Sequence, residues 1–182
     1  MFSSRHPDEL ASLVQGLGSL AKAGTVAEAI AFGDVVFIAV PYGAYPQIGK
    51  DYGGALAGKV VLDAGNAVAA RDGEITNEAK EEGIGVTSAK YLPGARIVRA
   101  FNTMSYRFFA SESNRAGDRM AIPIAGDDKD ALDVATTLVH DAGFDPVIIG
   151  PFARAKDFAQ GAPLYGQQLT AAEMRRRAEA LK

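Results

Sequence analysis

The chain contains no cysteine among its 182 residues, and it has only two histidines. Without cysteine it can form no disulfide, hold no thiolate-bound metal and use no thiol as a nucleophile. The histidines, His6 and His140, lie far apart without the spacing of zinc ligands. We therefore expect no metal site and no disulfide chemistry.

Long apolar runs and an excess of basic charge are also missing. No stretch approaches the roughly 18 apolar residues that a membrane span requires, and the N-terminus has no hydrophobic signal region. The formal net charge of −3 argues against a broad basic surface for nucleic acid. Hydrophobic residues make up 48% of the chain and charged residues 23%, as in an ordinary globular domain. These features predict a cytoplasmic protein that binds neither membrane nor nucleic acid.

Short runs of β-branched and other apolar residues predict five strands, at residues 35–40, 60–62, 97–100, 121–125 and 146–149. The run at 35–40 is apolar throughout, which is typical of a strand buried on both faces. Pro123 has no N–H to donate to a neighbouring strand, so we expect the run that contains it to lie at a sheet edge.

Helical patterns separate these runs, at residues 7–17, 26–32, 128–142 and after residue 170. The second and the last begin with a T-x-x-E capping box, formed by Thr25 with Glu28 and by Thr170 with Glu173. Asp127 is the expected cap of the helix at 128–142, and residues 150–165 read as a loop. Strands that alternate with helices predict an α/β fold with a mostly parallel sheet.

Ligands of such sheets bind at the carboxyl ends of the strands, so the polar residues there are the candidates for a site. Ser3, Ser4 and Arg5 lie between a short strand-like start and a helix opened by Pro7. Two hydroxyls and a guanidinium at a helix N-terminus suit an anion. In dinucleotide-binding folds an acidic residue at this place selects a ribose 2′-hydroxyl, whereas an arginine accommodates a 2′-phosphate. The segment favours NADP over NAD, and a solvated turn is an equally good interpretation of it.

Three more candidate segments follow predicted strands: Val40-Pro41-Tyr42, Asp63-Ala64-Gly65-Asn66 and Phe101-Asn102-Thr103. The first two also fit an ordinary strand exit and an ordinary turn. The third places an amide and a hydroxyl directly after a buried strand, where they suit a carboxamide or a flat heterocycle. Taken alone, each segment has a structural interpretation as well as a functional one.

The order of these segments along the chain resembles a known family. The most specific block runs from Pro93 to Thr103 and reads P-G-A-R-I-V-R-A-F-N-T. It takes its place in a series of segments, at residues 3–7, 24–25, 39–42, 58–66, 92–103, 125–128, 143–146 and 150–151. Over about residues 1–166 this series resembles the NADP oxidoreductases of the deazaflavin (coenzyme F420) dependent type. The same module is similar to the cytosolic part of a class of metalloreductases.

The resemblance implies a Rossmann-like dinucleotide-binding domain over residues 1–150, followed by a C-terminal loop and helix over 151–182. It implies hydride transfer between NADPH and a small, flat acceptor such as a deazaflavin or flavin. No residue has to act as acid or base, because the two ring systems carry the chemistry.

The resemblance also implies a set of cofactor-binding residues. Ser4 and Arg5 would hold the 2′-phosphate, and Ser3 and Thr25 belong to the same cofactor-binding set. The remaining members would lie beside the ribose, the nicotinamide and the acceptor: Val40, Pro41, Asn66, Asn102 and Thr103.

The chain departs from the family in one respect. The family begins with a strand and a G-x-G-x-x-G turn that holds the pyrophosphate. Here Gly16 and Gly18 lie inside or just beyond a helix instead of after a strand. In the strand order 3-2-1-4-5-6 the first strand is central, so its neighbours would have unpaired backbone groups. We therefore expect an N-terminally incomplete fold that binds NADPH weakly or not at all, and that is poorly soluble or self-associates through a free strand edge.

Two other functions are compatible with the sequence. The chain is also interpreted as a non-catalytic NADP-binding module or an inactive truncated relic, and the missing glycine turn favours that reading. An imine or hydroxy-acid reductase shares the same Rossmann half but needs a large helical C-terminal domain. Only about 30 residues follow the last predicted strand, which disfavours that class. A homodimer is left open.

Overall fold

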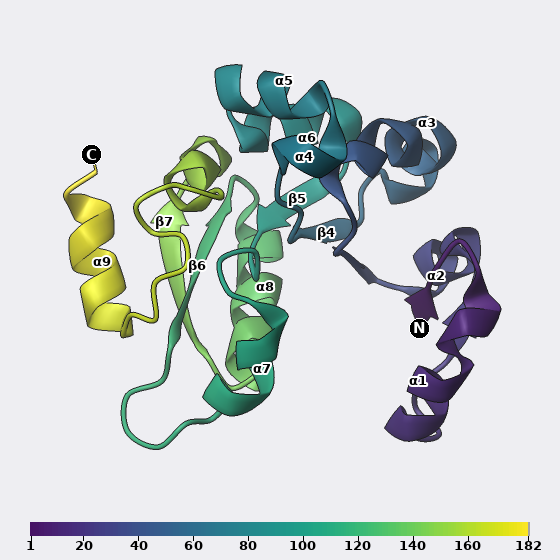
Figure 1. The fold of residues 1–182 in the computed structure, drawn as a ribbon, viewed down its shortest axis with the longest axis horizontal. Helices are drawn as coiled ribbons and strands as arrows, with labels where there is room; N and C mark the ends of the chain where they lie inside the picture. The colour runs from purple at the N-terminus through teal and green to yellow at the C-terminus, as the bar shows by residue number, and fades with distance from the viewer. Residues whose placement is uncertain (182) are drawn as a thin grey trace.

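The computed structural model describes residues 1–181 and contains two separate β-sheets (Figure 1). The larger sheet has the strand order β3-β4-β5-β6-β7, with bounds Val35–Ile38, Val60–Asp63, Arg96–Arg99, Ala121–Gly126 and Asp145–Gly150. Strands β3, β4 and β5 are parallel, β6 is antiparallel to β5, and β7 is parallel to β6. The predicted α/β fold with a mostly parallel sheet is confirmed.

The first 33 residues form a small unit, here called the N-terminal unit. It contains the elements β1 (Phe2–Ser3), η1 (Pro7–Leu10), α1 (Ala11–Leu17), β2 (Ala23–Gly24) and α2 (Val26–Phe32). Its two strands pair in parallel and form the smaller sheet. Helix α2 has the predicted capping box, in which the Thr25 hydroxyl accepts from the Glu28 N–H. The unit packs on the remainder of the chain through α2 and α3 (Tyr45–Leu56).

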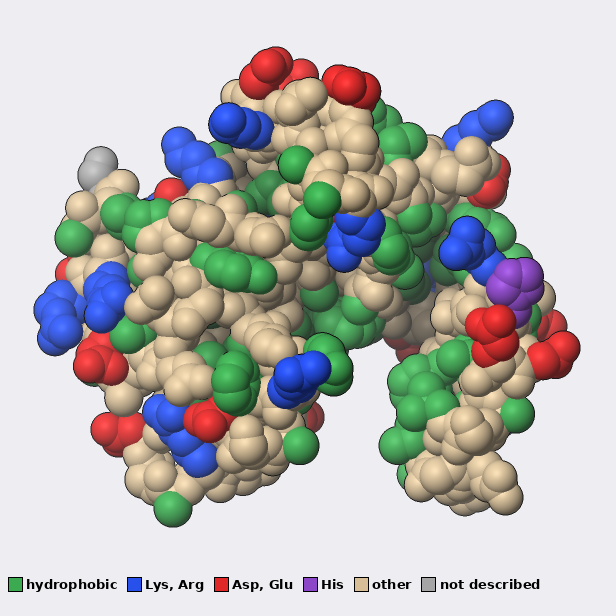
Figure 2. All heavy atoms as spheres, viewed as in Figure 1, with side chains coloured by type: hydrophobic (Ala, Val, Ile, Leu, Met, Phe, Trp, Pro, Cys, Tyr) green, Lys and Arg blue, Asp and Glu red, His purple; other side chains and the backbone are tan. Residues whose placement is uncertain are grey.

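The sheet is divided between β1 and β3. Among the described strands, β1 pairs only with β2 and β3 pairs only with β4, so each of the two has a free edge. Figure 2 shows a deep indentation between the N-terminal unit and the rest of the molecule. The prediction that residues 35–40 form a strand buried on both faces is therefore wrong. Strand β3 is shorter, and Phe37 within it is 53% exposed because its side chain lines an open cavity on one face of the sheet.

The helix predicted at residues 7–17 forms as the 3-10 turn η1 followed by α1. Its apolar face is not buried, since Leu13 and Leu17 remain exposed. The N-terminal unit has no second layer that could cover these side chains.

Strand β6 corrects the prediction about Pro123. The strand is buried throughout and lies between β5 and β7, not at an edge. It pairs with β5 only at Ala125 and Gly126, next to Val98 and Arg99. No strand on that side requires an N–H from residue 123, so a proline is tolerated within an internal strand.

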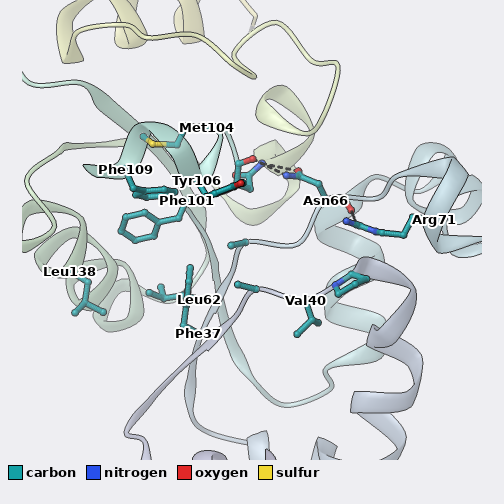
Figure 3. A pocket seen from close by; sticks show the side chains of 14 residues that line it. Phe37, Val40, Leu62, Asn66, Arg71, Phe101, Met104, Tyr106, Phe109 and Leu138 are labelled. Atoms are coloured by element: carbon teal, nitrogen blue, oxygen red, sulfur yellow. Dashed lines mark hydrogen bonds between the residues drawn. The ribbon is translucent and has the colours of Figure 1, made fainter. Parts of the chain in front are cut away.

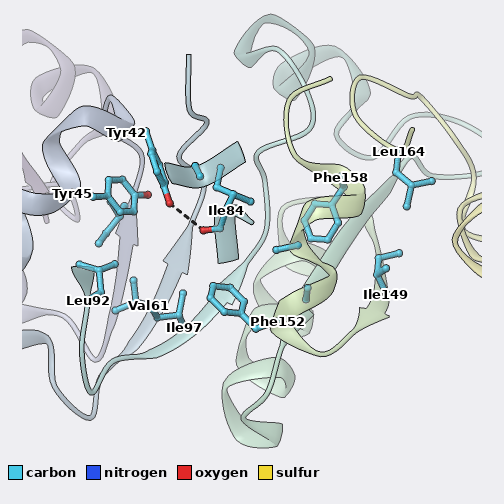
Figure 4. Close-up of a cluster of buried hydrophobic side chains, with 14 of the residues drawn as sticks. Tyr42, Tyr45, Val61, Ile84, Leu92, Ile97, Ile149, Phe152, Phe158 and Leu164 are labelled. Atoms are coloured by element: carbon cyan, nitrogen blue, oxygen red, sulfur yellow. Dashed lines mark hydrogen bonds between the residues drawn. The ribbon is translucent and has the colours of Figure 1, made fainter. Parts of the chain in front are cut away.

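Helices cover both faces of the larger sheet. Alternating side chains of β4 point to opposite faces, and Val61 belongs to one buried cluster whereas Val60 and Leu62 belong to the other. The first cluster lies under α3, α6 (Ile84–Tyr91) and η3 (Phe152–Phe158), and Figure 4 shows its members. The second lies under α8 (Lys129–Asp141). The remaining elements are η2 (Tyr42–Ala44), α4 (Ala69–Asp72), α5 (Ile75–Glu81), α7 (Tyr106–Glu112) and α9 (Ala171–Glu179).

Three details after residue 126 refine the prediction. Asp128, not Asp127, caps α8, because its carboxylate accepts from the Ala131 N–H. The Asp127 carboxylate accepts instead from the N–H of Phe152, at the start of η3 in the segment expected to be a loop. Helix α9 begins with the predicted capping box and packs against β6 and β7. No helix within residues 1–181 is both long and apolar enough to span a membrane.

Candidate functional site

A cavity of about 750 Å³ opens at the carboxyl ends of β3, β4 and β5 (Figure 3). These strands are parallel, so the segments that follow them meet at one edge of the sheet. Most of the wall is apolar, and it includes Phe37, Val40, Leu62, Phe101, Phe109 and Leu138. Asn66, Arg71 and Asn102 supply its polar end.

Phe101 is the central residue of the aromatic side. Its ring centroid lies 5.8 Å from that of Phe37 and 5.9 Å from that of Phe109. The backbone of Phe101 has a φ of +61°, which is rare for a residue with a bulky side chain. Such strain persists only where the surrounding structure enforces it, and it is typical of ligand sites. The aromatic side therefore offers ring faces and edges to a flat ligand.

Two amides form the polar end. The Asn66 Nδ2 donates to the carbonyl oxygen of Asn102 at 2.8 Å. The Asn102 Nδ2 donates to the carbonyl of Phe158 at 2.8 Å and to Asn66 Oδ1 at 3.3 Å. The Asn102 Oδ1 is buried and has no hydrogen-bond partner within residues 1–181. An unpaired buried acceptor costs roughly 1–3 kcal/mol, so a ligand donor that reached this oxygen would remove a real penalty.

A buried ion pair between Asp63 and Arg99 contacts this polar end at Asn66. Asp63 ends β4 and Arg99 ends β5, both side chains are fully buried, and Arg99 Nη1 lies 3.0 Å from Asp63 Oδ2. The Asp63 carboxylate also accepts from Tyr45 at 2.6 Å, from Ser88 at 2.7 Å and from the Gly65 N–H at 2.9 Å. Burial raises the pKa of the Tyr45 hydroxyl well above its usual value, and the negative charge of Asp63 raises it further. The network fixes the turn that leads to Asn66.

Arg71 lies at the mouth of the cavity. Its Nε and Nη2 both donate to the Asp72 carboxylate at 2.8 Å, and Nη2 donates to the carbonyl oxygen of Asn66 at 2.8 Å. The hydrogen bonds from Arg71 lower the pKa of Asp72 to about 2. The guanidinium is thus held against the turn that carries Asn66, with its charge largely balanced by Asp72.

The structure brings together four of the predicted site residues, because Val40, Pro41, Asn66 and Asn102 all line the cavity. Thr103 does not line the cavity and is buried, with 2% of its surface exposed. Its carbonyl oxygen accepts from the Gly166 N–H, and its hydroxyl has no partner within residues 1–181.

The other predicted residues belong to the N-terminal unit and do not line the cavity. The Ser4 hydroxyl accepts from the His6 N–H, and Ser3 and Arg5 are exposed. The Thr25 hydroxyl accepts from the Glu28 N–H and donates to the Glu28 carboxylate. Both hydrogen bonds of this hydroxyl therefore belong to the capping box of α2. The roles of these four residues in cofactor binding stay predictions.

Asp63 and Arg99 were not identified as a pair from the sequence. The sequence pattern places Asp63 in a turn and Arg99 within the block from Pro93 to Thr103. A signal was present, since two neighbouring strands with apolar residues in their middle end in opposite charges. These two residues are register partners of the parallel pair β4–β5, and a charge that is buried needs a partner.

Comparison with known proteins supports the resemblance seen in the motifs. Residues 1–67 match the family model described as NADP oxidoreductase, coenzyme F420-dependent. This stretch is shorter than the residues 1–166 over which the motifs indicate the family. No curated protein matches the chain.

Three solved structures have the same fold. A hypothetical protein, SMa0349 from Sinorhizobium meliloti, is 28% identical with a TM-score of 0.76, over 92% of this chain and 82% of that one. A protein from Arthrobacter sp. FB24 assigned as an F420-dependent NADP reductase is 23% identical with a TM-score of 0.62, over 73% and 62%. A pyrroline-5-carboxylate reductase from Coxiella burnetii is 16% identical with a TM-score of 0.55, over 98% and 65%.

The last two alignments cover less than two thirds of those proteins' own lengths. The similar structures establish a Rossmann-like α/β fold for this chain. The family match establishes that its first 67 residues have the sequence pattern of the coenzyme F420-dependent NADP oxidoreductases.

Proposed function

We propose that this chain is an oxidoreductase that binds NADP and transfers a hydride between NADPH and a flat redox acceptor. The observation that carries the proposal is the cavity at the carboxyl ends of three parallel strands, with aromatic rings on one side and two amides at one end. The family pattern of residues 1–67 supports NADP as the dinucleotide.

The residues present fit a nicotinamide ring. A carboxamide carries an N–H that suits the unpartnered Asn102 Oδ1, and the ring itself suits the apolar wall around Phe101. The cavity volume lies within the roughly 300–1,000 Å³ of small-molecule sites. Bound NADPH supplies the hydride. The chain's own residues orient the ring and exclude water, which is where the protein contributes to such a reaction.

The phosphate end of the dinucleotide is assigned to Ser3, Ser4 and Arg5. Arg5 is exposed, and none of the described side chains is hydrogen-bonded to its guanidinium. A guanidinium recognises a phosphate through paired donors. This supports NADP over NAD as the preferred dinucleotide.

The experiment is a titration of the full chain with NADPH, followed by nicotinamide fluorescence, and then an assay of NADPH oxidation. The acceptors are a deazaflavin, a flavin, a quinone and a metal chelate, tested one at a time. We expect weak but saturable binding, because no G-x-G-x-x-G turn is present in the sequence to hold the pyrophosphate, and oxidation with at least one of the flat acceptors. Asn102→Ala should reduce the rate of NADPH oxidation. Asn77→Ala, which changes an exposed amide on α5, should leave that rate unchanged.

A second candidate function, a module that binds NADP without catalysis, is favoured by the separation of the predicted site residues between two sheets. Ser3, Ser4 and Arg5 lie on the N-terminal unit, whereas the ring-binding residues lie on the larger sheet. A chain that binds NADPH but oxidises it with none of the four acceptors would be a binding module rather than an enzyme. Absence of any NADPH binding would contradict both proposals.

A further inference from the structure

Arg99 contacts one of the two cavity amides, that of Asn66, as well as Asp63. Its Nη2 donates to the Gly65 carbonyl at 2.5 Å and to Asn66 Oδ1 at 3.2 Å. An arginine has donors only and cannot accept a hydrogen bond. The Asn66 side chain must therefore turn its oxygen toward Arg99, and its nitrogen points away to the Asn102 carbonyl.

The orientation of the Asn66 side chain in turn determines that of Asn102. Asn66 Oδ1 can only accept, so Asn102 must present its nitrogen to it. The Phe158 carbonyl, which is also an acceptor, fixes the same nitrogen from the other side. The Asn102 oxygen is left as the group without a partner.

We propose that Arg99 is a positioning residue that sets the polarity of the cavity's polar end. Acting through Asn66, it leaves the Asn102 Oδ1, buried at this polar end, as a hydrogen-bond acceptor without a partner within residues 1–181. The preferred ligand is then a flat ring that carries an amide donor, over the same ring carrying a carboxylate. This choice of ligand rests on the proposed function, whereas the orientation of the two amides does not.

The ion pair alone does not account for this arrangement. A buried salt bridge is weak evidence for stability, because well-packed apolar residues often replace one without loss. Asp63 occupies only Nη1 of Arg99, whereas Nη2 is directed at the turn that carries Asn66. The hydrogen bonds thus connect the Arg99 charge to the amides at the polar end of the cavity.

The first measurement follows the side-chain amide signals of Asn66 and Asn102 by ¹⁵N NMR in the full chain without ligand. In Arg99→Lys, a single ammonium can retain the pair with Asp63 but cannot also reach Gly65 and Asn66. We expect both amide signals to shift and to exchange with water at least about tenfold faster, as when a hydrogen bond is lost. The matched control is Arg96→Lys, which changes an arginine of the same strand that pairs with Asp128 outside the cavity.

The second measurement compares NADPH with the analogue in which a carboxylate replaces the carboxamide. The unchanged chain and Arg96→Lys should bind NADPH about tenfold more tightly than the analogue, and this ratio should fall to about threefold or less in Arg99→Lys. If Arg99→Lys does not fold, Asn66→Ala makes the same test, because it removes the oxygen that links Arg99 to Asn102.

The outcomes separate the two proposals. Unchanged Asn102 amide signals in the folded variants would overturn the positioning role. Shifted signals with an unchanged binding ratio would overturn the choice of ligand. If the unchanged chain binds neither dinucleotide, the proposed function fails, and the amide signals still decide whether Arg99 positions the two amides.

Discussion

Replacing Asp63 by asparagine should destabilise the fold severely while changing almost no volume. Four donors converge on the two carboxylate oxygens, from Tyr45, Ser88, Gly65 and Arg99. An asparagine keeps one oxygen and replaces the other with an NH₂ group. Wherever the amide turns, one of these donors meets another donor, and the Arg99 guanidinium is left buried without a counter-charge.

The expected loss follows from that burial. Removing one partner of a fully buried ion pair costs roughly 3–5 kcal/mol, because the remaining charge stays out of water. A domain of this kind has a total unfolding free energy of about 5–15 kcal/mol. Asp63→Asn should therefore remove between a fifth and nearly all of the stability.

The assay is urea unfolding monitored by circular dichroism, with the free energy of unfolding extrapolated to water. Asp133→Asn is the matched control, because its carboxylate pairs with Lys129 on the exposed face of α8. That change should cost no more than about 0.5 kcal/mol. If Asp63→Asn costs less than about 1 kcal/mol, the buried pair is not the constraint described above.

Four further predictions concern the cofactor, the chemistry, acid stability and association. Arg5→Ala should weaken NADPH binding by about 1.5–3 kcal/mol, a charge-assisted hydrogen bond, and hardly affect NADH; equal losses with both would contradict the phosphate assignment. Asn102→Ala should lower turnover more than NADPH affinity in steady-state kinetics, and an unchanged rate would return this residue to a structural role. Hydrogen bonds from Arg96 lower the pKa of Asp128 from 3.8 to about 2, so the stabilising contribution of this carboxylate is present above about pH 4 and is lost as the pH falls to 2. The Tm of Asp128→Asn should therefore fall less than that of the unchanged chain across this window, and an equal fall of both Tm values would contradict the prediction. Phe37→Lys on the free edge of β3 should reduce self-association in size-exclusion chromatography, since charged side chains protect strand edges; an unchanged elution profile would place any association elsewhere.

Local signals in the sequence predicted the elements whose determinants lie within a few residues. The capping boxes at Thr25 and Thr170 both form, because each needs only a glutamate three residues later. Strand β4 was predicted to within one residue, since its run is apolar and buried on both faces. These features depend on short-range chemistry that a single sequence displays.

The helices between residues 45 and 91 were not predicted, and for α3 and α6 their glycines explain why. Glycine normally weakens a helix, and α3 contains three, including Gly49. A Cβ at Gly49 would lie 1.8 Å from the Tyr91 carbonyl oxygen, and one at Gly85 would lie 2.6 Å from that of Phe152. These glycines allow close approach between elements and do not mark helix ends. The requirement comes from tertiary packing, which the local pattern does not contain.

The predicted site residues form two groups, one on the smaller sheet with its N-terminal unit and one on the larger sheet. The sequence correctly directed attention to the ends of the strands, and four predicted residues meet there because β3, β4 and β5 are parallel neighbours. It did not indicate that Ser3, Ser4 and Arg5 would lie on a separate unit, because strand pairing is decided by partners distant in sequence. The residues assigned to the ring and those assigned to the phosphate are therefore held by different sheets, which are connected by the chain from α2 to β3 and by the packing of α2 on α3. It follows that recognition of the nicotinamide depends on the buried network at Asp63 and Arg99, whereas the preference for a 2′-phosphate depends on how the N-terminal unit is held beside it.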